Sequence, residues 1–254
     1  MKAKSFLRLI SKRFPKRLAE SFDRVGLMTG KMPEDIKKVF LCLDLDWEIF
    51  PKVKHFHPDL IITHHPFIFG TKYRVFKNDE SKKLLCEEID KLGIPVYSFH
   101  TNFDKGVGGM NDALCEALRL EGVYTPLLNP MMRIGYLQED TDIFSFADFA
   151  KHHLDVNYGL LIHEGKPFIK KIGIIGGGGS RDWEVAKNEG CDIYISGDAP
   201  HHVRRDIVNA KFNYLDLPHE IEKIFMPQME KYLLSIDKNL MIQSFDHERL
   251  PKVI

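Results

Sequence analysis

Two adjacent histidines, His64 and His65, stand where an apolar run of the sequence ends, in the segment LIITHHP. In the middle of a β-strand consecutive side chains point to opposite faces, so such a pair could not converge there. Pro66 holds His65 in an extended conformation and removes a backbone donor, which indicates that the strand stops at this point. At a strand end the two imidazoles can splay around a shared cleft and hold one or two metal ions. A plain polar cap on the strand is the alternative.

His100 and Asp104 follow the next apolar run in the same way, within the segment FHTNFD. Asp104 offers hard oxygen ligands that can bridge two cations, and His100 can ligate or act as a general base. Asp44, at the end of an earlier run, can reach the same place. Ligands of open α/β sheets bind at the carboxyl ends of the strands, so these side chains are expected near the histidine pair. An Asx-type turn that caps a helix is the alternative for this segment.

A late strand-like run ends shortly before His219, which precedes Glu222 by three residues and Lys223 by four. Residues three or four apart share a helix face, so His219 and Glu222 can reach the same ion. Acidic residues at a helix start also favour the helix dipole, which explains Glu222 without a metal but leaves His219 unexplained. A lysine at position 223 that points into the site would lower metal affinity through like-charge repulsion.

Three strand ends thus supply imidazoles and carboxylates for a metal site. The candidate ligands are His64, His65, Asp104, His219 and Glu222. This mixture suits Zn, Fe, Mn, Co or Ni better than Ca or Mg alone. Five ligands, one of them able to bridge, exceed what one catalytic zinc needs and indicate two divalent ions per chain. A two-metal site can activate water and hold a leaving oxygen, which is the chemistry of a hydrolase.

Two further segments offer substrate contacts. The glycine cluster IIGGGGS can cradle an anion through Gly178 and Ser180, and a tight strand-to-helix turn is an equally good explanation. The cluster is not a dinucleotide fingerprint, because Arg181 stands where the third glycine belongs. In the later segment SGDAPHH, Asp198 and His201 are interpreted as substrate contacts, with surface exposure as the alternative for the histidine.

The elements that would position these residues alternate along the chain. Strand-like runs are expected at 39–45, 59–65, 94–101, 132–137, 158–163, 170–176, 191–198, 213–217 and 239–245. Helices are expected at 4–13, 47–56, 79–92, 110–120, 145–154, 181–190 and 200–210, with a long helix after His219. This alternation predicts an α/β fold with mostly parallel sheets covered by helices on both faces. A turn-rich piece at 121–130 is the expected boundary between halves at 1–124 and 125–254.

The composition narrows the class of function. The 254 residues suffice for one large α/β domain or two small ones. Basic and acidic residues both number 36, so the formal net charge is zero and nucleic acid is not an expected partner. Four separated cysteines fit reduced thiols, and no apolar stretch approaches the ~20 residues of a membrane span, so a cytoplasmic protein is expected. A GxSxG nucleophile motif is absent.

Several segments together resemble the NIF-three family of dinuclear metal centre hexameric proteins, often labelled GTP cyclohydrolase type 2 homologues. They are DRVGLMTG, LIITHHPFIFG, FHTNFDKGVGGMNDALCEAL, IGIIGGGGS and CDIYISGDAPHH, in the family's order over nearly the whole chain. The resemblance implies that His64, His65 and Asp104 are metal ligands, joined by a late histidine and glutamate. The family's late motif GHxxxE stands here as PHEIEK, so Pro218 replaces the glycine and Glu222 comes one residue early.

The same resemblance implies two interlinked three-layer α/β halves, a metal site in the cleft between them, and assembly as a homohexameric ring. The length of the chain corresponds to the compact form without an inserted domain. Two functional hypotheses follow. One is a metal-dependent hydrolase of a nucleotide or phosphoester, GTP cyclohydrolase type 2-like by resemblance, with His100 as general base. The other is a non-catalytic metal-binding or regulatory scaffold. Neither hypothesis requires a membrane as partner.

Overall fold

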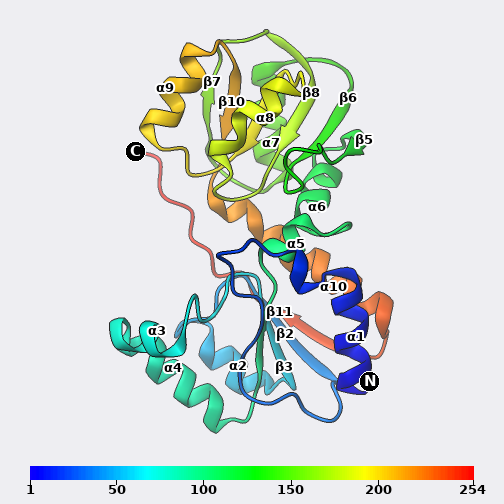
Figure 1. The fold of residues 1–254 in the computed structure, drawn as a ribbon, viewed down its shortest axis with the longest axis vertical. Coiled ribbons are helices and arrows are strands. Elements are labelled where there is room, and N and C mark those ends of the chain that lie inside the picture. Colours follow the sequence, from blue (N-terminus) through cyan, green and yellow to red (C-terminus); the bar gives the residue numbers. More distant parts are fainter. The chain divides into compact units, whose positions relative to one another are not determined.

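The computed structural model describes residues 1–254, which divide into two compact units, each built on its own sheet (Figure 1). The first unit comprises Met1–Gly109 and Phe225–His247, and the second comprises Met110–Ile224 and Glu248–Ile254. This division differs from the sequence-based boundary after residue 124, because the segment 110–124 packs within the second unit. None of the helices is long and apolar enough to cross a membrane.

The sheet of the first unit has the strand order β1-β4-β3-β2-β11. Its strands are β1 (Gly26–Thr29), β2 (Lys38–Cys42), β3 (Leu60–Thr63), β4 (Val96–Ser98) and β11 (Met241–Ser244). The pairs β11–β2, β2–β3 and β3–β4 are parallel, and only the edge strand β1 is antiparallel. All four residues of β3 are buried, as expected of a central strand with both faces covered. The prediction of a mostly parallel sheet is confirmed for this unit.

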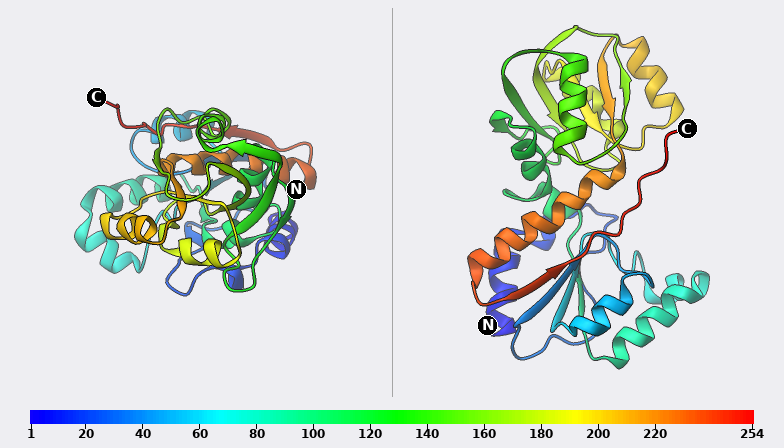
Figure 2. Two further views of the ribbon diagram at one scale, coloured as in Figure 1. Left: turned by 90° about the horizontal axis from the view of Figure 1, so that it is seen from above. Right: turned by 180° about the vertical axis from the view of Figure 1, so that it is seen from behind.

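Helices cover this first sheet on both faces. The helices of this unit are α1 (Ala3–Arg13), α2 (Phe50–Phe56), α3 (Lys72–Asn78), α4 (Glu80–Lys91), α5 (Thr101–Lys105) and α10 (Phe225–Ile236), with a 3₁₀ turn η1 (Lys16–Leu18). Phe40 and Ile61 pack with α2 and α4 in one core cluster, whereas α10 contacts β2 and β11 (Figure 2). Asp79 caps α4 by accepting a hydrogen bond from Lys82 N, and Gly93 follows that helix with φ +69°, a conformation that favours glycine.

The sheet of the second unit has the strand order β5-β6-β8-β9-β10-β7. Its strands are β5 (Glu121–Tyr124), β6 (Arg133–Asp142), β7 (Leu160–Ile162), β8 (Phe168–Ile174), β9 (Ile193–Ser196) and β10 (Asn213–Asp216). Only β8–β9 and β9–β10 are parallel, whereas β5–β6, β6–β8 and β10–β7 are antiparallel. The sheet is therefore mixed, and the expectation of mostly parallel pairing is wrong here. The polar, exposed end of β6 is typical of antiparallel strands.

The second sheet is the middle of three layers. The helices are α6 (Met110–Ala117), α7 (Ile143–His153), α8 (Trp183–Asn188) and α9 (His201–Asn209), with 3₁₀ turns η2 (Ser180–Asp182) and η3 (His219–Ile224). Ile193 and Leu215 face the core cluster that contains residues of α6 and α7. Their neighbours Tyr194 and Tyr214 face the cluster that contains residues of α8 and α9. This alternation along β9 and β10 places helices on both faces, which confirms the α/β fold class.

Candidate metal centre

The first unit brings three histidines together at the carboxyl ends of β3 and β4. We name this group, His64, His65 and His100, the histidine cluster. One ring nitrogen of each lies within 4.8 Å of those of the others. The ring centroids are 5.1 Å apart for His64 and His65, 5.2 Å for His64 and His100, and 5.7 Å for His65 and His100. The backbone hydrogen bonding between β2 and β3 continues past the end of β3. His64 N donates to Cys42 O, and His65 N donates to Leu43 O.

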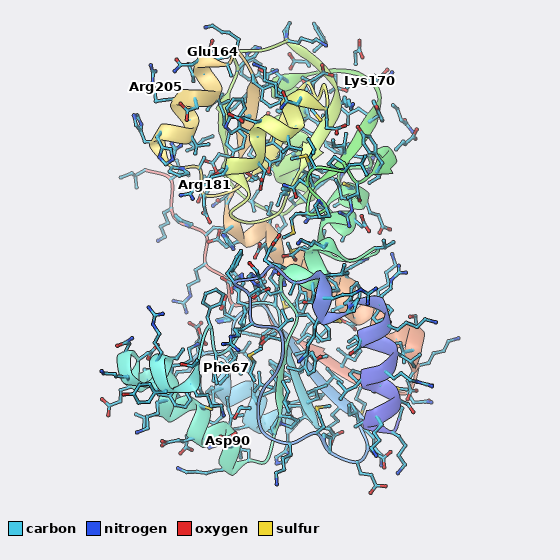
Figure 3. The ribbon with its side chains drawn as sticks, viewed as in Figure 1. Phe67, Asp90, Glu164, Lys170, Arg181 and Arg205 are labelled. Atoms are coloured by element: carbon cyan, nitrogen blue, oxygen red, sulfur yellow. The ribbon has the colours of Figure 1, made fainter.

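The chain turns directly after the histidine pair, as Pro66 predicts. Thr63 Oγ1 donates to His65 O over 2.8 Å, which closes the turn. Phe67, labelled in Figure 3, is buried, and its N–H donates to Ser98 Oγ at the end of β4. Thr63 and Ser98 also share a hydrogen bond of 2.7 Å between their hydroxyls. These contacts join the two strand ends, so the imidazoles that follow them are held in a fixed relation.

Each ring of the histidine cluster uses Nδ1 for a protein oxygen. His64 Nδ1 donates to Phe99 O over 2.9 Å, and His65 Nδ1 lies 2.7 Å from Asp44 Oδ2. His100 Nδ1 lies 2.9 Å from Asp23 Oδ1. A neutral imidazole that donates through Nδ1 carries its lone pair on Nε2. This arrangement of a histidine with an oxygen acceptor behind it is the one that metal-binding histidines adopt.

Asp104 lies on α5, where it is buried beside the cluster. Its Oδ1 is 3.6 Å from His64 Nε2, which is longer than a hydrogen bond. Two ligand atoms held about 2.1 Å from one ion at a tetrahedral angle lie about 3.4 Å apart. The spacing of this carboxylate and imidazole therefore fits a shared metal ion. The apolar rings of Phe103 and Phe225 pack on this side, with the Phe225 centroid 4.9 Å from that of His64.

Two carboxylates behind the cluster remain charged. Burial alone would raise the pKa of the Asp44 carboxyl, but its hydrogen bond with His65 holds the pKa below the usual value. The Asp23 side chain has no exposed surface. Burial would raise its pKa too, yet hydrogen bonds with His100 and Thr101 lower it. The sequence analysis did not identify Asp23 as part of the site, because its contact with His100 spans 77 positions. The one available signal was its place in the segment DRVGLMTG, which resembles the family.

The second unit contains a histidine–carboxylate group at η3. We name His219, Glu222 and Asp198 the His219 group. His219 Nε2 lies 3.1 Å from Glu222 Oε2, and its Nδ1 lies 2.5 Å from Asp198 Oδ2. The turn is a 3₁₀ helix rather than the start of the expected α-helix, and residues three apart eclipse each other in that geometry. The spacing of three between His219 and Glu222 is therefore the one that this turn requires.

The charges around His219 favour its protonated form. The hydrogen bond with Glu222 is the main cause, and it raises the pKa of His219 to about 9 with help from Asp198. Lys223 does not add its charge here, because its Nζ donates to the backbone oxygen and the carboxylate of Asp155. The expected repulsion between a lysine and a bound metal therefore has no basis in this structure.

The glycine cluster after β8 is shaped around the His219 group. Gly177 has φ +64°, and a Cβ built there would lie 1.9 Å from Glu222 Oε1 and 3.2 Å from His219 Cε1. Only glycine leaves room for the carboxylate at this position. Gly178, by contrast, would meet nothing closer than Asp198 Oδ2 at 3.7 Å. The glycines thus fit a turn that admits Glu222.

The predicted substrate contacts lie in different surroundings. Asp198 contacts His219, as described above. Ser180 is buried at the start of η2, and His201 is exposed on the first turn of α9. The role of these residues and of Gly178 in binding a substrate stays a prediction. The same holds for the expectation that the histidine cluster and the His219 group serve one pair of ions.

A two-unit α/β protein with imidazoles backed by oxygen acceptors defines a class of candidate metalloproteins, and comparison with known proteins gives the family. Residues 1–250 match the Duf34/NIF3 (NGG1p interacting factor 3) family, so the chain belongs to it. This confirms the family assignment from the sequence segments.

Relatives and solved structures agree with this assignment. The GTP cyclohydrolase 1 type 2 homolog of Clostridium perfringens is 31% identical over 225 residues, covering 86% of each chain. The homolog of the same description from Lactococcus lactis is 30% identical over 257 residues, covering 99% of this chain and 98% of that one. A Bacillus cereus protein related to NIF3 shares the fold at 22% identity, with TM-score 0.86 over 100% of this chain and 99% of that one. A Staphylococcus aureus hypothetical protein does so at 21% identity, with TM-score 0.89 and the same coverage.

Proposed function

We propose that this protein binds two divalent metal ions and hydrolyses a nucleotide or phosphoester. One observation carries the proposal: four histidines that lie beside further imidazole or carboxylate groups each place Nδ1 against a protein oxygen. They are His64, His65, His100 and His219. A lone imidazole can make such a contact too, as His153 Nδ1 does with Phe149 O, but metal ligands and general bases depend on it to fix tautomer and ring orientation.

The residues that would hold the ions follow from donor type and place. His64, His65 and Asp104 would do so in the first unit, and His219 and Glu222 in the second. Nitrogen and oxygen donors of this kind suit Zn, Fe, Mn, Co or Ni. When bound, such ions would lower the pKa of a water molecule and polarise a phosphoryl or carbonyl group.

The remaining polar residues have supporting roles in this proposal. Asp23 fixes the tautomer of His100, whose Nε2 would accept a proton from the attacking water. Asp44 orients His65 and Asp198 orients His219 in the same manner. The apolar ring of Phe225 beside His64 limits water on that side of the cluster.

The names of the relatives suggest the substrates to test first. A cyclohydrolase opens a ring of its substrate with water, so the panel includes GTP alongside other nucleoside triphosphates, phosphomonoesters and phosphodiesters. Purified protein is loaded with Zn, Mn, Fe, Co or Ni in turn, and its metal content is measured by mass spectrometry before each assay. Turnover that depends on metal supports the hydrolase. If protein with two bound ions turns over none of these substrates, the regulatory scaffold is favoured instead.

The decisive variant is Asp104→Ala, because Asp104 combines burial with a spacing that fits a shared ion. We expect it to lose metal and activity together while circular dichroism remains unchanged. Asp148→Ala is the matched control, since Asp148 is exposed and pairs only with Lys151. Full activity of Asp104→Ala at normal metal content would overturn the assignment.

We also propose that the chain assembles with itself as a homohexamer, in keeping with the family resemblance. Light scattering coupled to size-exclusion chromatography would then give six times the mass of one chain. A monomer at micromolar concentration would contradict this part of the proposal without affecting the metal sites.

A further inference from the structure

The second unit has a cavity of about 340 Å³ whose wall includes His219 and Asp198. Cavities that bind small molecules begin at roughly this size. Its other walls come from the ends of β10 and β7 and from α9. Because His219 and Asp198 are shared, any molecule in the cavity would lie directly beside the His219 group.

A buried carboxylate and a guanidinium lie together in this cavity. Asp216, at the end of β10, is only 8% exposed, and its Oδ2 is 3.7 Å from Arg204 Nε. Arg204 Nε donates to Ala199 O over 2.8 Å, which fixes the side chain. Both of these contacts use Nε, so the terminal amino groups of the guanidinium can donate to a ligand. The cavity thus presents an acceptor and a donor side by side.

The rest of the wall is mostly apolar, with Glu220 as a further acidic residue, and it includes one aromatic ring. Tyr158 lines the cavity with Leu217 and Pro218. Burial raises the pKa of Tyr158, and the nearby carboxylates of Glu220 and Asp216 add to this shift. The phenol therefore lies close to the acidic groups, in the wall of the cavity.

We propose that this cavity binds the heterocyclic base of a nucleotide. The inference rests on the proposed function, in that the base would belong to the substrate whose reacting group meets the metal ions. A nucleobase has a flat face that stacks on an aromatic ring, and every base has this face. It also has an edge where hydrogen-bond donors and acceptors alternate, which complements Asp216 and Arg204. A bare phosphate or sugar could pair with Arg204 or Asp216, but it has no flat face to stack on the ring.

Nucleosides test the inference, because they lack the phosphates that metal ions attract. Full-length protein treated with EDTA is titrated calorimetrically with guanosine, inosine, adenosine and uridine, with ribose 5-phosphate as the comparison. We expect at least one nucleoside to bind and ribose 5-phosphate not to. Failure of all four nucleosides to bind at millimolar concentration would overturn the inference, as would equal binding of ribose 5-phosphate.

Substitutions locate the binding within the protein. Asp216→Asn should weaken binding of the preferred nucleoside about tenfold or more, because it removes a charged acceptor. Tyr158→Leu should weaken binding of every nucleoside by about tenfold, since stacking does not depend on base identity. Thermal melts confirm that each variant folds. Unchanged affinity in both folded variants would contradict the proposal.

Neighbouring arginines on α9 supply a matched pair. Arg204 lines the cavity, whereas Arg205 is exposed on the same helix and is labelled in Figure 3. Arg204→Gln should weaken nucleoside binding severalfold and Arg205→Gln should not. Equal effects of the two would indicate a general charge effect and would overturn the proposal. These binding tests do not require turnover. Nucleoside binding without hydrolysis would support the cavity and contradict the hydrolase. Hydrolysis with an unchanged KM in Asp216→Asn would support the hydrolase and contradict the cavity.

Discussion

The histidine cluster and the His219 group share carboxylates at Nδ1 but differ in what contacts Nε2. In the cluster, the carboxylates of Asp23 and Asp44 contact Nδ1 atoms and so stand behind the rings. In the His219 group, Glu222 contacts Nε2 directly and holds a proton there. The first arrangement is ready to accept a metal ion, whereas the second must release a proton first. We therefore infer that metal affinity depends more steeply on pH at His219 than in the cluster.

Two of the aspartates that contact Nδ1 atoms differ strongly in burial. The Asp23 side chain is 0% exposed and that of Asp198 is 57% exposed, although each contacts the Nδ1 atom of a histidine. Water can replace Asp198 if it is removed, but it cannot easily replace Asp23. Equivalent hydrogen bonds should thus contribute very different free energies of folding.

The largest effect is expected when these two aspartates are replaced. Asp23→Ala should lower the free energy of unfolding by about 2–3 kcal/mol, because it strips partners from His100 and from both the N–H and hydroxyl of Thr101. Asp198→Ala should change it by less than about 1 kcal/mol, since that pair is exposed. Urea denaturation of the metal-free variants provides the values. Equal losses of unfolding free energy in the two variants would show that burial does not distinguish these two aspartates.

A smaller effect should follow from adding one methyl group to the glycine turn. Gly177→Ala forces a side chain into a left-handed conformation and against Glu222 Oε1. We expect a loss of about 1–2 kcal/mol in stability and weaker metal binding at His219. Gly178→Ala is the control, because its Cβ would make only an ordinary contact. If both variants behave like the parent protein, the turn does not shape the group.

The sequence predicted well where the strands end. It predicted only some of the side chains that meet at those ends. His64, His65 and His100 converge because parallel strands β3 and β4 end at the same edge, which apolar runs and Pro66 indicate. Asp23 could not be found this way, because it follows no apolar run and meets His100 only through the tertiary fold.

Differences between the expected and observed fold had similar origins. The sequence analysis placed the segment 110–124 in the first half, which it follows along the chain. In the structure, Asn111 Oδ1 accepts a hydrogen bond from Gly176 N in the second unit. Such a contact between segments 65 positions apart has no local signal. The antiparallel pairing of β6 did have one, since its polar stretch QEDTD cannot belong to a strand that is buried on both faces. The 3₁₀ turn at His219 had no sequence signal, because apolar periodicity does not distinguish it from the start of an α-helix.

A change of pH should affect the His219 group selectively. Its pKa is about 9 in the folded protein against an ordinary value of 6.5, so protonated His219 stabilises the metal-free fold fully below pH 6.5. That contribution is lost as the pH rises from 6.5 to about 9. Because the ring is partly exposed, we expect a fall in Tm of only about 2 °C from this source. Calorimetry of EDTA-treated protein measures it, and Glu222→Gln should remove most of the dependence. An unchanged pH profile in that variant would contradict the assignment.

The smallest effect is expected at Lys223, where the family pattern GHxxxE has glutamate. Its ammonium group pairs with the largely exposed carboxylate of Asp155, so Lys223→Gln should cost less than about 1 kcal/mol in stability. Metal affinity at His219 should change by less than about twofold, because this charge is already paired away from the group. Lys223→Glu sharpens the comparison: if Glu222 already serves as the ligand, a second glutamate adds little affinity. A large gain in metal binding for Lys223→Glu, with none for Lys223→Gln, would show instead that position 223 is the true ligand position and that Glu222 does not replace it.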